Sequence, residues 1–371
     1  MSEHEVVIVG AGPAGIATAI SLQDRGVRPL LVDRAGEIAS SWRTRYDRLK
    51  LNTGRQFSHL PGRRYPKGTP TFPTRDQVIE HLDRHTRGVA IALRFNTAVN
   101  RIEQRPGGWR LHTSSGDIDA RHAVVATGMM HTPSVPVWPG EFTGEVLHSS
   151  EYRNPVPYEG RRVLVVGSGS SGMEIAHDLA TGGVANVWMA VRTPPNIILR
   201  GGPAGLPGDV ISLPLYHAPK RLADAISRRA RSRFIGDLSD FGLPVPTEGP
   251  FTLLARTNHV PSLVDPDVIN AIRDGSIEVV ATVDAFDDDG VRLVDGRRLD
   301  PDVVVCATGY LTGLEPLVGH LGVLDDRGKP RISGDNPAAP GLWFIGFTAR
   351  PSLIGFVGRQ SRRLAKKIAK G

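Results

Sequence analysis

One local pattern, a strand-like apolar run that ends in glycines at fixed spacing, constrains this fold most, and the chain carries it twice. The first copy spans residues 6–22, VVIVGAGPAGIATAISL, and predicts a buried strand, a turn and a helix. Gly10, Gly12 and Gly15 have the GxGxxG spacing. The first glycine permits a tight turn, the second lets the backbone approach a pyrophosphate, and the third allows close helix packing. The pattern therefore predicts an α/β fold that holds a dinucleotide at the helix N-terminus.

The strand that follows adds a second sign of nucleotide binding. Residues 27–33, VRPLLVD, end in Asp33, whose carboxylate can accept hydrogen bonds from both hydroxyls of a ribose. A bare GxGxxG is a weak motif, and glycines that only shape a turn are the alternative; the flanking strands and Asp33 favour a nucleotide. The candidate cofactor-binding residues of this half are Gly10, Gly12, Pro13, Ala14, Gly15, Asp33 and Arg34.

The second copy, VLVVGSGSSGMEIAHDLA at 163–180, differs from the first at the end of its next strand. That strand, ANVWMAVR, ends at Arg192 where the first copy has an acid. A guanidinium pairs with a 2′-phosphate, which a carboxylate would repel, so we expect NADPH rather than NADH; a solvated surface arginine is the alternative. Thr193 and Arg200 are candidate helpers of Arg192. The candidates of this half are Gly167, Ser168, Gly169, Ser170, Ser171, Gly172, Arg192 and Thr193.

Each half closes with a further strand that runs into the tripeptide ATG, in HAVVATG at 122–128 and DVVVCATG at 302–309. Ligands bind at the carboxyl ends of strands in open α/β sheets, where a bulky side chain would block a cofactor. The candidates here are Ala126, Thr127, Gly128, Thr308 and Gly309. Cys306 lies within the second of these strands, and we interpret it as a buried small apolar residue.

The order of these segments predicts two dinucleotide-binding, Rossmann-like domains, one inserted into the other. The chain after residue 312 supplies a strand and a helix that are most economically returned to the first domain. We therefore expect a discontinuous domain of residues 1–155 and 312–371, interrupted by a domain of residues 156–311. Residues 201–250 have weak periodicity and are expected to be partly helical around 218–234.

Composition excludes several classes of protein. The single cysteine forbids an intramolecular disulfide, a CxxC redox pair and a cysteine-built zinc site. No apolar stretch approaches the roughly 20 residues of a membrane-spanning helix, and the acidic N-terminus is unlike a secretory signal, so we expect a cytoplasmic protein without a membrane anchor. The net charge of +7 comes from dispersed residues, which favours small anionic ligands over nucleic acid. No metal-ligand motif is present.

The segment between the two halves narrows the function. FTGEVLHSSEY at 142–152 has the FxGxxxHxxx(Y/F) spacing and resembles the identifying motif of flavin-containing monooxygenases. Tyr152 stands where the similar Baeyer-Villiger motif has tryptophan. SSWRTRYDRLKLNT at 40–53, FPTRDQVIEHL at 72–82 and CATGY at 306–310 are similar to the plant YUCCA type and its bacterial relatives. The resemblance covers nearly the whole chain, and it assigns FAD to the first domain and NADPH to the second.

The resemblance implies that NADPH reduces FAD and that oxygen then adds at flavin C4a. The resulting hydroperoxide would oxygenate a soft nucleophilic nitrogen or sulfur, or an activated carbonyl, of a small molecule. In related monooxygenases an asparagine lies beside the flavin and NADP+ at the position of Asn52, which is our candidate catalytic residue. Its amide can donate a hydrogen bond without titrating. The alternative is an asparagine that only shapes a turn before Gly54.

Other site residues follow from the same resemblance. Ser41, Trp42 and Arg43 are expected near the flavin, although Trp42 could equally be a core side chain. Tyr310 is expected to connect the domains and line the NADP+ site, with a packed aromatic as the alternative. Gly346 and Phe347 stand where many related flavoproteins have Gly-Asp near the flavin. His148 is expected to be structural.

Two other functions stay open at this stage. A reductase or oxidase of the same fold would pass electrons to a disulfide, quinone or protein, although the lack of CxxC removes the dithiol route. A regulatory flavoprotein would bind the nucleotides without turnover. The oligomeric state is open, a homodimer included, as is the identity of the substrate.

Overall fold

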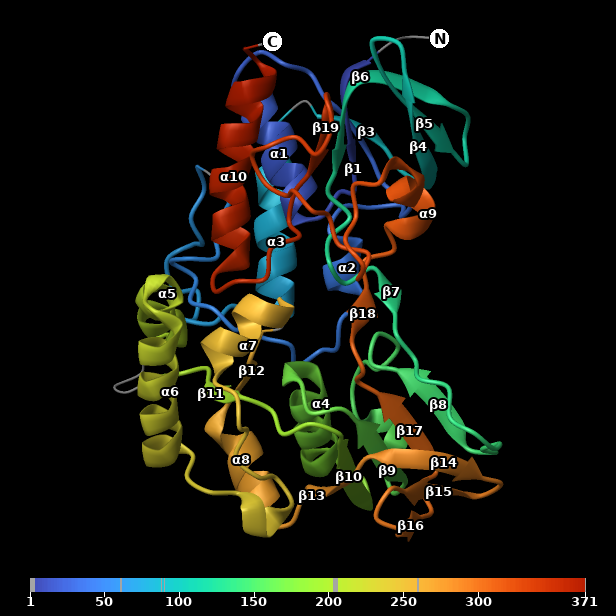
Figure 1. The fold of residues 1–371 in the computed structure, drawn as a ribbon, viewed down its shortest axis with the longest axis vertical. Helices are drawn as coiled ribbons and strands as arrows, with labels where there is room; N and C mark the ends of the chain where they lie inside the picture. The colour runs from blue at the N-terminus through green and yellow to red at the C-terminus, as the bar shows by residue number, and fades with distance from the viewer. Residues whose placement is uncertain are drawn as a thin grey trace. The chain divides into compact units, whose positions relative to one another are not determined.

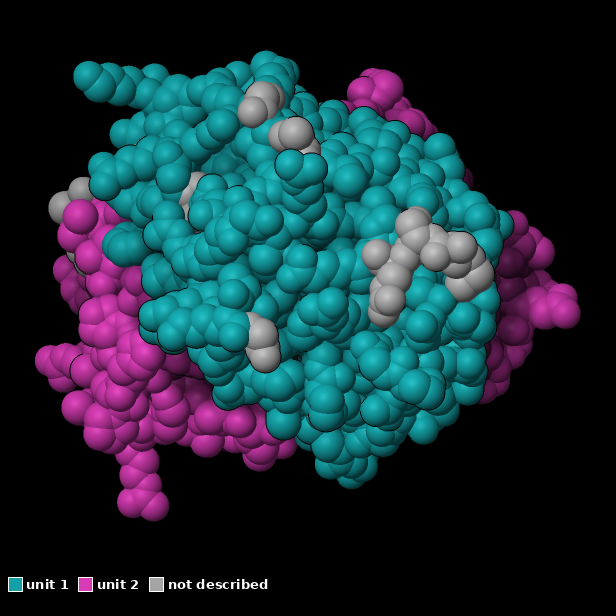
Figure 2. All heavy atoms as spheres, turned by 90° about the horizontal axis from the view of Figure 1, so that it is seen from above, with its two compact units in different colours: residues 1–43, 54–132, 310–371 teal, residues 44–53, 133–309 magenta. Residues whose placement is uncertain are grey.

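The chain forms two compact units, which Figure 2 distinguishes by colour. The computed structural model describes residues 4–60, 62–87, 89, 91–202, 206–258 and 260–370. Unit 1 comprises Met1–Arg43, Gly54–Thr132 and Tyr310–Gly371; unit 2 comprises Thr44–Thr53 and Pro133–Gly309. Each unit is thus built from segments that lie far apart in the sequence.

These boundaries differ from the expected ones in three places, the smallest of which is that residues 310–311 lie in unit 1. Residues 133–155 lie in unit 2, because strand β8 (Glu145–His148) pairs in parallel with β17 (Val303–Cys306). The short segment Thr44–Thr53 also lies in unit 2, although both of its neighbours in sequence belong to unit 1. Pairing between distant strands therefore sets the division more than the positions of the two glycine motifs.

Unit 1 is a sheet covered by helices (Figure 1). Among the described residues seven strands form this sheet, in the order β3-β2-β1-β6-β5-β4, with β19 also paired to β6. β1, β2, β3, β6 and β19 are parallel, whereas β5 is antiparallel to both β4 and β6. The strands are β1 (His4–Val9), β2 (Leu30–Val32), β3 (Ala92–Arg94), β4 (Val99–Arg105), β5 (Gly108–Thr113), β6 (Ile118–Val125) and β19 (Leu342–Phe344), and the short β18 (Tyr310–Leu311) lies outside the sheet.

The helices of unit 1 join its two ends in sequence. α1, α3 and α10 lie together, and the hydroxyls of Thr18 on α1 and Ser361 on α10 are 3.1 Å apart in the buried contact (Figure 1). Thr74 begins α3 with a capping box that includes Gln77. The helices are α1 (Pro13–Gln23), α2 (Ser40–Arg43), α3 (Arg75–Thr86), α9 (Glu315–Val318) and α10 (Leu353–Ile368), with a 3-10 turn at Gly319–Leu321.

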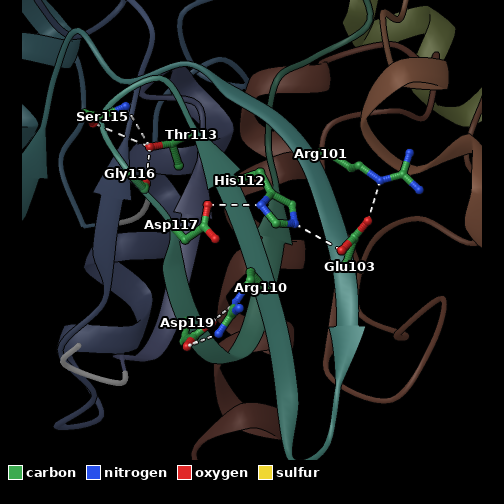
Figure 3. A network of polar contacts seen from close by, with 9 residues as sticks. All are labelled: Arg101, Glu103, Arg110, His112, Thr113, Ser115, Gly116, Asp117 and Asp119. Carbon is green, nitrogen blue, oxygen red and sulfur yellow. Dashed lines mark hydrogen bonds and ion pairs between the residues drawn. The ribbon is translucent and has the colours of Figure 1, made fainter.

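A polar network covers the exposed face of the antiparallel strands β4, β5 and β6 (Figure 3). Arg110 donates to both carboxylate oxygens of Asp119, at 2.9 and 3.1 Å. The imidazole of His112 lies between Glu103, at 3.1 Å, and Asp117, at 3.0 Å. These cross-strand pairs stabilise the strand register on the face that water can reach.

Unit 2 has an all-parallel sheet, and in its described part five strands follow the order β13-β10-β9-β17-β8. A three-stranded antiparallel sheet and the pair β11-β12 lie beside it. The further strands are β9 (Arg162–Val166), β10 (Asn186–Val191), β11 (Ile197–Leu199), β12 (Ser262–Val264), β13 (Glu278–Ala281), β14 (Val283–Asp287), β15 (Gly290–Leu293) and β16 (Arg298–Leu299); β7 (Thr132–Pro133) spans the unit boundary. The helices are α4 (Ser170–Thr181), α5 (Gly208–His217), α6 (Lys220–Phe234), α7 (Pro250–Thr257) and α8 (Pro266–Arg273), with 3-10 turns at Val156–Tyr158 and Ser239–Phe241.

The apolar runs predicted to be strands are buried, as expected for strands with both faces covered. Val6, Val7 and Ile8 of β1 and Val163, Leu164 and Val165 of β9 are wholly inaccessible. Cys306 is also wholly buried, which confirms its interpretation as a core residue, and burial raises the pKa of its thiol to about 11. The predicted α/β class, with two Rossmann-like halves, is confirmed. No helix within the described ranges combines the length and apolar character needed to cross a bilayer.

Candidate functional site

The first glycine turn joins β1 to α1, and its geometry requires glycine at two positions. Gly10 has φ +107°, and a Cβ there would lie 2.8 Å from the carbonyl oxygen of Ala126. A Cβ on Gly15 would lie 1.8 Å from the carbonyl oxygen of Gly10, so α1 packs directly against the turn. Gly12, by contrast, has open space where a Cβ would stand. This space leaves the backbone at Gly12 open to a ligand, in keeping with the roles of the three glycines.

The N-terminus of α1 has no side-chain cap. Gly12 is the N-cap residue, and Pro13 and Ala14 open the helix without a capping hydrogen bond. The first N–H groups of a helix have no partner within it, and together with the helix dipole they attract an anion. A pyrophosphate supplies the acceptors that this helix end lacks.

Asp33 ties the end of β2 to the glycine turn. Its two carboxylate oxygens accept hydrogen bonds from the N–H groups of Ala11, at 2.6 Å, and Ala35, at 2.8 Å. A carboxylate has about four acceptor sites, so Asp33 can still accept ribose hydroxyls. The neighbouring Arg34 is exposed. The ribose contact therefore stays a prediction that the geometry allows.

The residues after β6 form a second wall of this turn. The hydroxyl of Thr127 is buried and has no hydrogen-bond partner among the described residues, and Gly128 has φ +78° with open space at its Cβ position. Gly346, with φ +89°, has its Cβ position 3.2 Å from the Cβ of Ala14. Phe347 instead belongs to the core, with its ring centroid 6.0 Å from that of Phe344. The flavin contacts expected of Gly346 and Phe347 stay predictions.

The SSWR segment forms the short helix α2, and its arginine is used within unit 1. The Arg43 guanidinium pairs with Asp83 of α3, at 2.6 Å, and with Glu37, at 3.0 Å. Ser41 is exposed and Trp42 is half-buried. Arg43 thus fastens α2 to α3, while contact of Ser41 and Trp42 with a flavin stays a prediction.

The second glycine turn repeats the geometry of the first. Gly167 has φ +115°, and a Cβ there would lie 2.6 Å from the carbonyl oxygen of Ala307. A Cβ on Gly172 would lie 2.0 Å from the carbonyl oxygen of Gly167. Gly169, the N-cap of α4, has open space at its Cβ position and no side-chain cap. Unit 2 therefore offers a second uncapped helix end for a pyrophosphate.

Strand β12 docks on this second turn, which the sequence did not reveal. The hydroxyl of Ser262 donates to the carbonyl oxygen of Ser168, and the hydroxyl of Ser170 accepts from the N–H of Leu263, each at 2.9 Å. Ser171 hydrogen-bonds to Tyr46. All three predicted serines thus contact residues outside the motif, and only the long-range contact could have identified Ser262 and Leu263.

Arg192 follows β10 and is exposed, as is Thr193. No ion pair or hydrogen bond engages the Arg192 guanidinium within the described part of the chain, so it is open to a phosphate. The structure contradicts the expectation that Arg200 helps it. The Arg200 side chain is only 2% exposed, and it pairs with Glu174 and, at 2.8 Å, with Asp265.

The second ATG segment is fixed by hydrogen bonds. Thr308 donates to the carbonyl oxygen of Ser134, and Gly309 has φ +85° with open space at its Cβ position. The Nε2 of His148 lies 3.0 Å from the carbonyl oxygen of Gly309, so Nε2 carries the proton. Burial, ahead of other causes, lowers the pKa of His148, whose other ring nitrogen accepts from the Ser150 N–H at 3.1 Å. These contacts fit the structural role expected of His148, which stays a prediction.

The rest of the FxGxxxHxxxY signature is also structural. A Cβ on Gly144 would lie 2.5 Å from the Phe142 ring. Tyr152 is wholly buried and donates to Asp178 of α4 at 2.8 Å. The signature therefore holds the segment before β9 against the sheet and α4 of unit 2.

Asn52 lies in the segment Thr44–Thr53, and this segment is bound to unit 2. The Oδ1 atom of Asn52 accepts from Nε of Arg200 at 3.2 Å. Tyr46 donates to Glu174 of α4, and Arg48 donates to Thr181 at the end of α4 at 3.0 Å. Sequence reasoning identified Asn52 but not these partners, which no motif marks. Its catalytic role stays a prediction, as does the NADP+ contact of Tyr310, which is half-buried in unit 1.

The two turns fit two dinucleotides, one in each unit. Each has an uncapped helix end, an open N-cap glycine and an ATG segment with a left-handed glycine at the carboxyl end of a strand. The first turn also has the carboxylate of Asp33 and the hydroxyl of Thr127, which has no hydrogen-bond partner among the described residues. The second turn also has the exposed guanidinium of Arg192. Within the described ranges no group of three or more histidine, cysteine, aspartate or glutamate side chains is placed to hold a metal ion.

Comparison with known proteins places this arrangement among flavoprotein oxidoreductases. Residues 7–199 match the family model described as pyridine nucleotide-disulphide oxidoreductase. The chain is 35% identical over 368 residues to indole-3-pyruvate monooxygenase YUCCA1 of Oryza sativa subsp. japonica, a match that covers 96% of this chain and 89% of that protein. It is 36% identical over 361 residues to the probable indole-3-pyruvate monooxygenase YUCCA9 of Arabidopsis thaliana, covering 94% and 85%.

The fold has a counterpart among solved structures. The flavin-containing monooxygenase from Stenotrophomonas maltophilia superposes with a TM-score of 0.73 at 22% sequence identity, and the match covers 100% of this chain and 99% of that one. At this identity the likeness concerns the fold alone. The sequence relatives, by contrast, match this chain from end to end at a level that identifies a family.

Proposed function

The chain belongs to the flavin-containing monooxygenase family, and from this premise we propose that it oxygenates a soft nitrogen or sulfur, or an activated carbonyl, of a small molecule. It is a flavin-dependent monooxygenase that uses FAD, NADPH and O2. In total, one NADPH and one proton would supply the two electrons, one oxygen atom of O2 would enter the product, and the other would leave as water. The C4a route of oxygen transfer is part of this proposal.

One observation carries the assignment of cofactors to the units. The two glycine turns are alike in geometry but opposite in charge at the end of the next strand, with Asp33 after β2 and Arg192 after β10. An acid suits the ribose hydroxyls of FAD, and an open arginine suits the 2′-phosphate of NADPH. We therefore assign FAD to unit 1 and NADPH to unit 2.

The bound flavin supplies the oxygen chemistry, and the residues of the chain bind, orient and protect. The uncapped ends of α1 and α4 bind the pyrophosphates, with Gly12 and Gly169 as the points of close backbone approach. Asn52 donates a hydrogen bond from its amide without changing charge. Such a donor would stabilise negative charge that develops on an oxygen atom beside it.

Mass spectrometry of the product formed under 18O2 tests the function. The enzyme is supplied with FAD, NADPH and a panel that contains indole-3-pyruvate, on which the sequence relatives act, a thioether and a tertiary amine. We expect one panel member to gain a single 18O atom as NADPH is consumed. NADPH oxidation that needs an added quinone, with no 18O in any product, would instead establish a reductase.

The disulfide chemistry in the name of the matching family model does not transfer to this chain. Cys306 is the one cysteine of the sequence, and it is wholly buried with a raised thiol pKa of about 11. Dithiol exchange needs a thiolate and a second thiol. This protein must therefore pass its electrons to oxygen or to an acceptor other than its own cysteines.

A further inference from the structure

The amide of Asn52 has two chemically different ends, and the structure shows which end is occupied by protein. Its oxygen, Oδ1, lies 3.2 Å from Nε of Arg200. A guanidinium has only donors, so the atom that faces it must be the amide oxygen. The contact with Arg200 therefore fixes the rotation of the amide, and with it the direction of Nδ2. No hydrogen bond from Nδ2 occurs to any residue that the structure describes.

Arg200 is itself held in place by two carboxylates from separate elements. Its side chain is 2% exposed and contacts Glu174, on α4, and Asp265, at 2.8 Å. Asp265 is the N-cap residue of α8, but its carboxylate caps no N–H of that helix. A planar guanidinium can serve three acceptors in fixed directions, which a lysine ammonium cannot reproduce.

The backbone that carries Asn52 is anchored to the same helix. Tyr46 donates to Glu174, the carboxylate that also pairs with Arg200. Arg48 lies 3.5 Å from Asp178 and 3.0 Å from Thr181, both on α4. The backbone and the side chain of Asn52 are thus both held in place by contacts with α4, the helix that begins at the second glycine turn.

We propose that Arg200 is a positioning residue, which holds Oδ1 of Asn52 so that Nδ2 is the end that donates to the oxygenated cofactor. The inference rests on the proposed function of Asn52. It separates two roles within one side chain: Oδ1 is structural and Nδ2 is functional. It also explains a buried arginine that lies outside both glycine motifs.

A double-mutant cycle on peroxide formation tests the positioning. The readout is the rate of NADPH oxidation to H2O2 by the FAD-loaded enzyme without substrate, in which NADPH, a proton and O2 give NADP+ and H2O2. Asn52→Ala is expected to raise this rate roughly tenfold, the effect of losing one strong hydrogen bond. Arg200→Met should raise it similarly, and the double variant should be no faster than either single variant, because both act through one hydrogen bond.

Three further variants define what the cycle measures. Asn52→Asp keeps an acceptor for Arg200 but has no amide donor, so it should fold and form peroxide as fast as Asn52→Ala. Arg256→Met removes an exposed arginine of unit 2 that pairs with Glu248 at 2.6 Å, and it should leave the rate unchanged. Arg200→Lys keeps the charge without the fork and serves if Arg200→Met does not fold.

A second measurement does not depend on turnover. Selective [15N]asparagine labelling of the protein without cofactors reports the two Nδ2 protons of Asn52, assigned by their absence in Asn52→Ala. We expect Arg200→Lys to shift these resonances and speed their exchange with water, and Arg256→Met to leave both unchanged.

The outcomes separate the two ideas. If Asn52→Ala leaves peroxide formation unchanged, the proposed role of Asn52 is wrong, and Arg200 has no part in catalysis through it. Suppose that Asn52→Ala forms peroxide faster than the wild type, whereas the Arg200 variants form it at the wild-type rate and leave the Asn52 amide resonances unshifted. In that case only the positioning role of Arg200 is wrong. Peroxide formation by Asn52→Asp at the wild-type rate would show that Oδ1, not Nδ2, is the functional end.

Discussion

At the scale of single residues, three glycines and one charge distinguish each nucleotide turn, and the sequence was sufficient to find them. At the first and third glycines of the GxGxxG spacing a Cβ would meet backbone, which cannot move aside at low cost, whereas the middle glycine has open space at its Cβ position. Asp33 and Arg192 were found in the same way, because each directly follows a strand. Arg200 could not be assigned from sequence, since its partners Glu174 and Asp265 lie in other elements.

Arg192 offers a direct test of cofactor choice. We expect Arg192→Glu to weaken NADPH binding on the order of tenfold to a hundredfold, because it removes a charge-assisted hydrogen bond and adds repulsion, and to leave NADH binding nearly unchanged. Dissociation constants for both nucleotides, measured by titration of the FAD-loaded enzyme, check this. Arg256→Glu alters an exposed arginine of unit 2 that lies outside both glycine motifs, and it should keep the wild-type ratio. An unaltered ratio in Arg192→Glu would make Arg192 a solvated surface residue.

Gly172 and Gly169 form a matched pair in one motif. Gly172→Ala places a methyl 2.0 Å from the carbonyl oxygen of Gly167, whereas Gly169→Ala meets nothing within 4 Å. We expect Gly172→Ala to lower the free energy of unfolding by about 1–3 kcal/mol, the cost of overpacking, and Gly169→Ala to change it far less. Urea unfolding of both variants measures the difference. Equal stabilities would mean that α4 can withdraw from the turn.

At the scale of elements, the order of strands and helices was predictable, whereas the use of α3 was not. The capping box at Thr74 and the i, i+4 spacing of Val78 and Leu82 are typical of a helix such as the observed α3, but they do not reveal a buried histidine pair. His81 is 3% exposed, with the Tyr65 ring stacked on it at 4.0 Å and the His85 ring edge-on at 4.4 Å. Such packing depends on the segment before α3, which has no periodic pattern.

The buried pair predicts acid sensitivity of unit 1. Burial, followed by the charges of His85, His59 and Arg84, lowers the pKa of His81 to about 3. The unfolded chain protonates near pH 6.5, so between pH 6.5 and about 3 it binds more protons than the folded chain. As the pH falls through this window, the free energy of unfolding should therefore fall by up to about 1.4 kcal/mol per pH unit because of this residue. His81→Phe should reduce that slope in urea unfolding measured from pH 7.5 to 4.5, and an unchanged slope would assign the sensitivity elsewhere.

His112 supplies the opposite case in the same unit (Figure 3). The hydrogen bond with Glu103, ahead of other causes, raises the pKa of His112, and Asp117 adds to the shift. The stabilisation of the fold by His112 is complete below the pKa of this histidine in the unfolded chain, and it disappears as the pH rises through its pKa in the folded chain. At acid pH, His112→Asn should therefore be less stable than the wild type, whereas His81→Phe should lose less stability than the wild type does. Both signs follow from packing: one imidazole is surrounded by rings, the other by carboxylates.

At the scale of the whole molecule, two Rossmann-like units follow from the repeated motif, but the path of the chain between them does not. The sequence places Asn52 within the first half, between β2 and α3. The structure assigns Thr44–Thr53 to unit 2, and side chains of this segment also hydrogen-bond to α4 and to Arg200. A residue expected to act on the flavin is thus carried by the unit that we propose binds NADPH.

Hydrogen exchange of the FAD-loaded enzyme with and without NADP+ tests this division. Because Tyr46 and Arg48 are bound to α4, and α4 begins at the proposed pyrophosphate site, NADP+ should slow exchange in residues 44–53 together with α4. Helix α3, at Arg75–Thr86, follows in sequence but belongs to unit 1, and it is the internal control. If NADP+ instead changes the exchange of residues 44–53 in the same way as that of α3, the Asn52 segment does not belong with the NADPH unit. Protection shared with α4 alone would mean that bound NADP+ also orders the residue proposed to retain the oxygen.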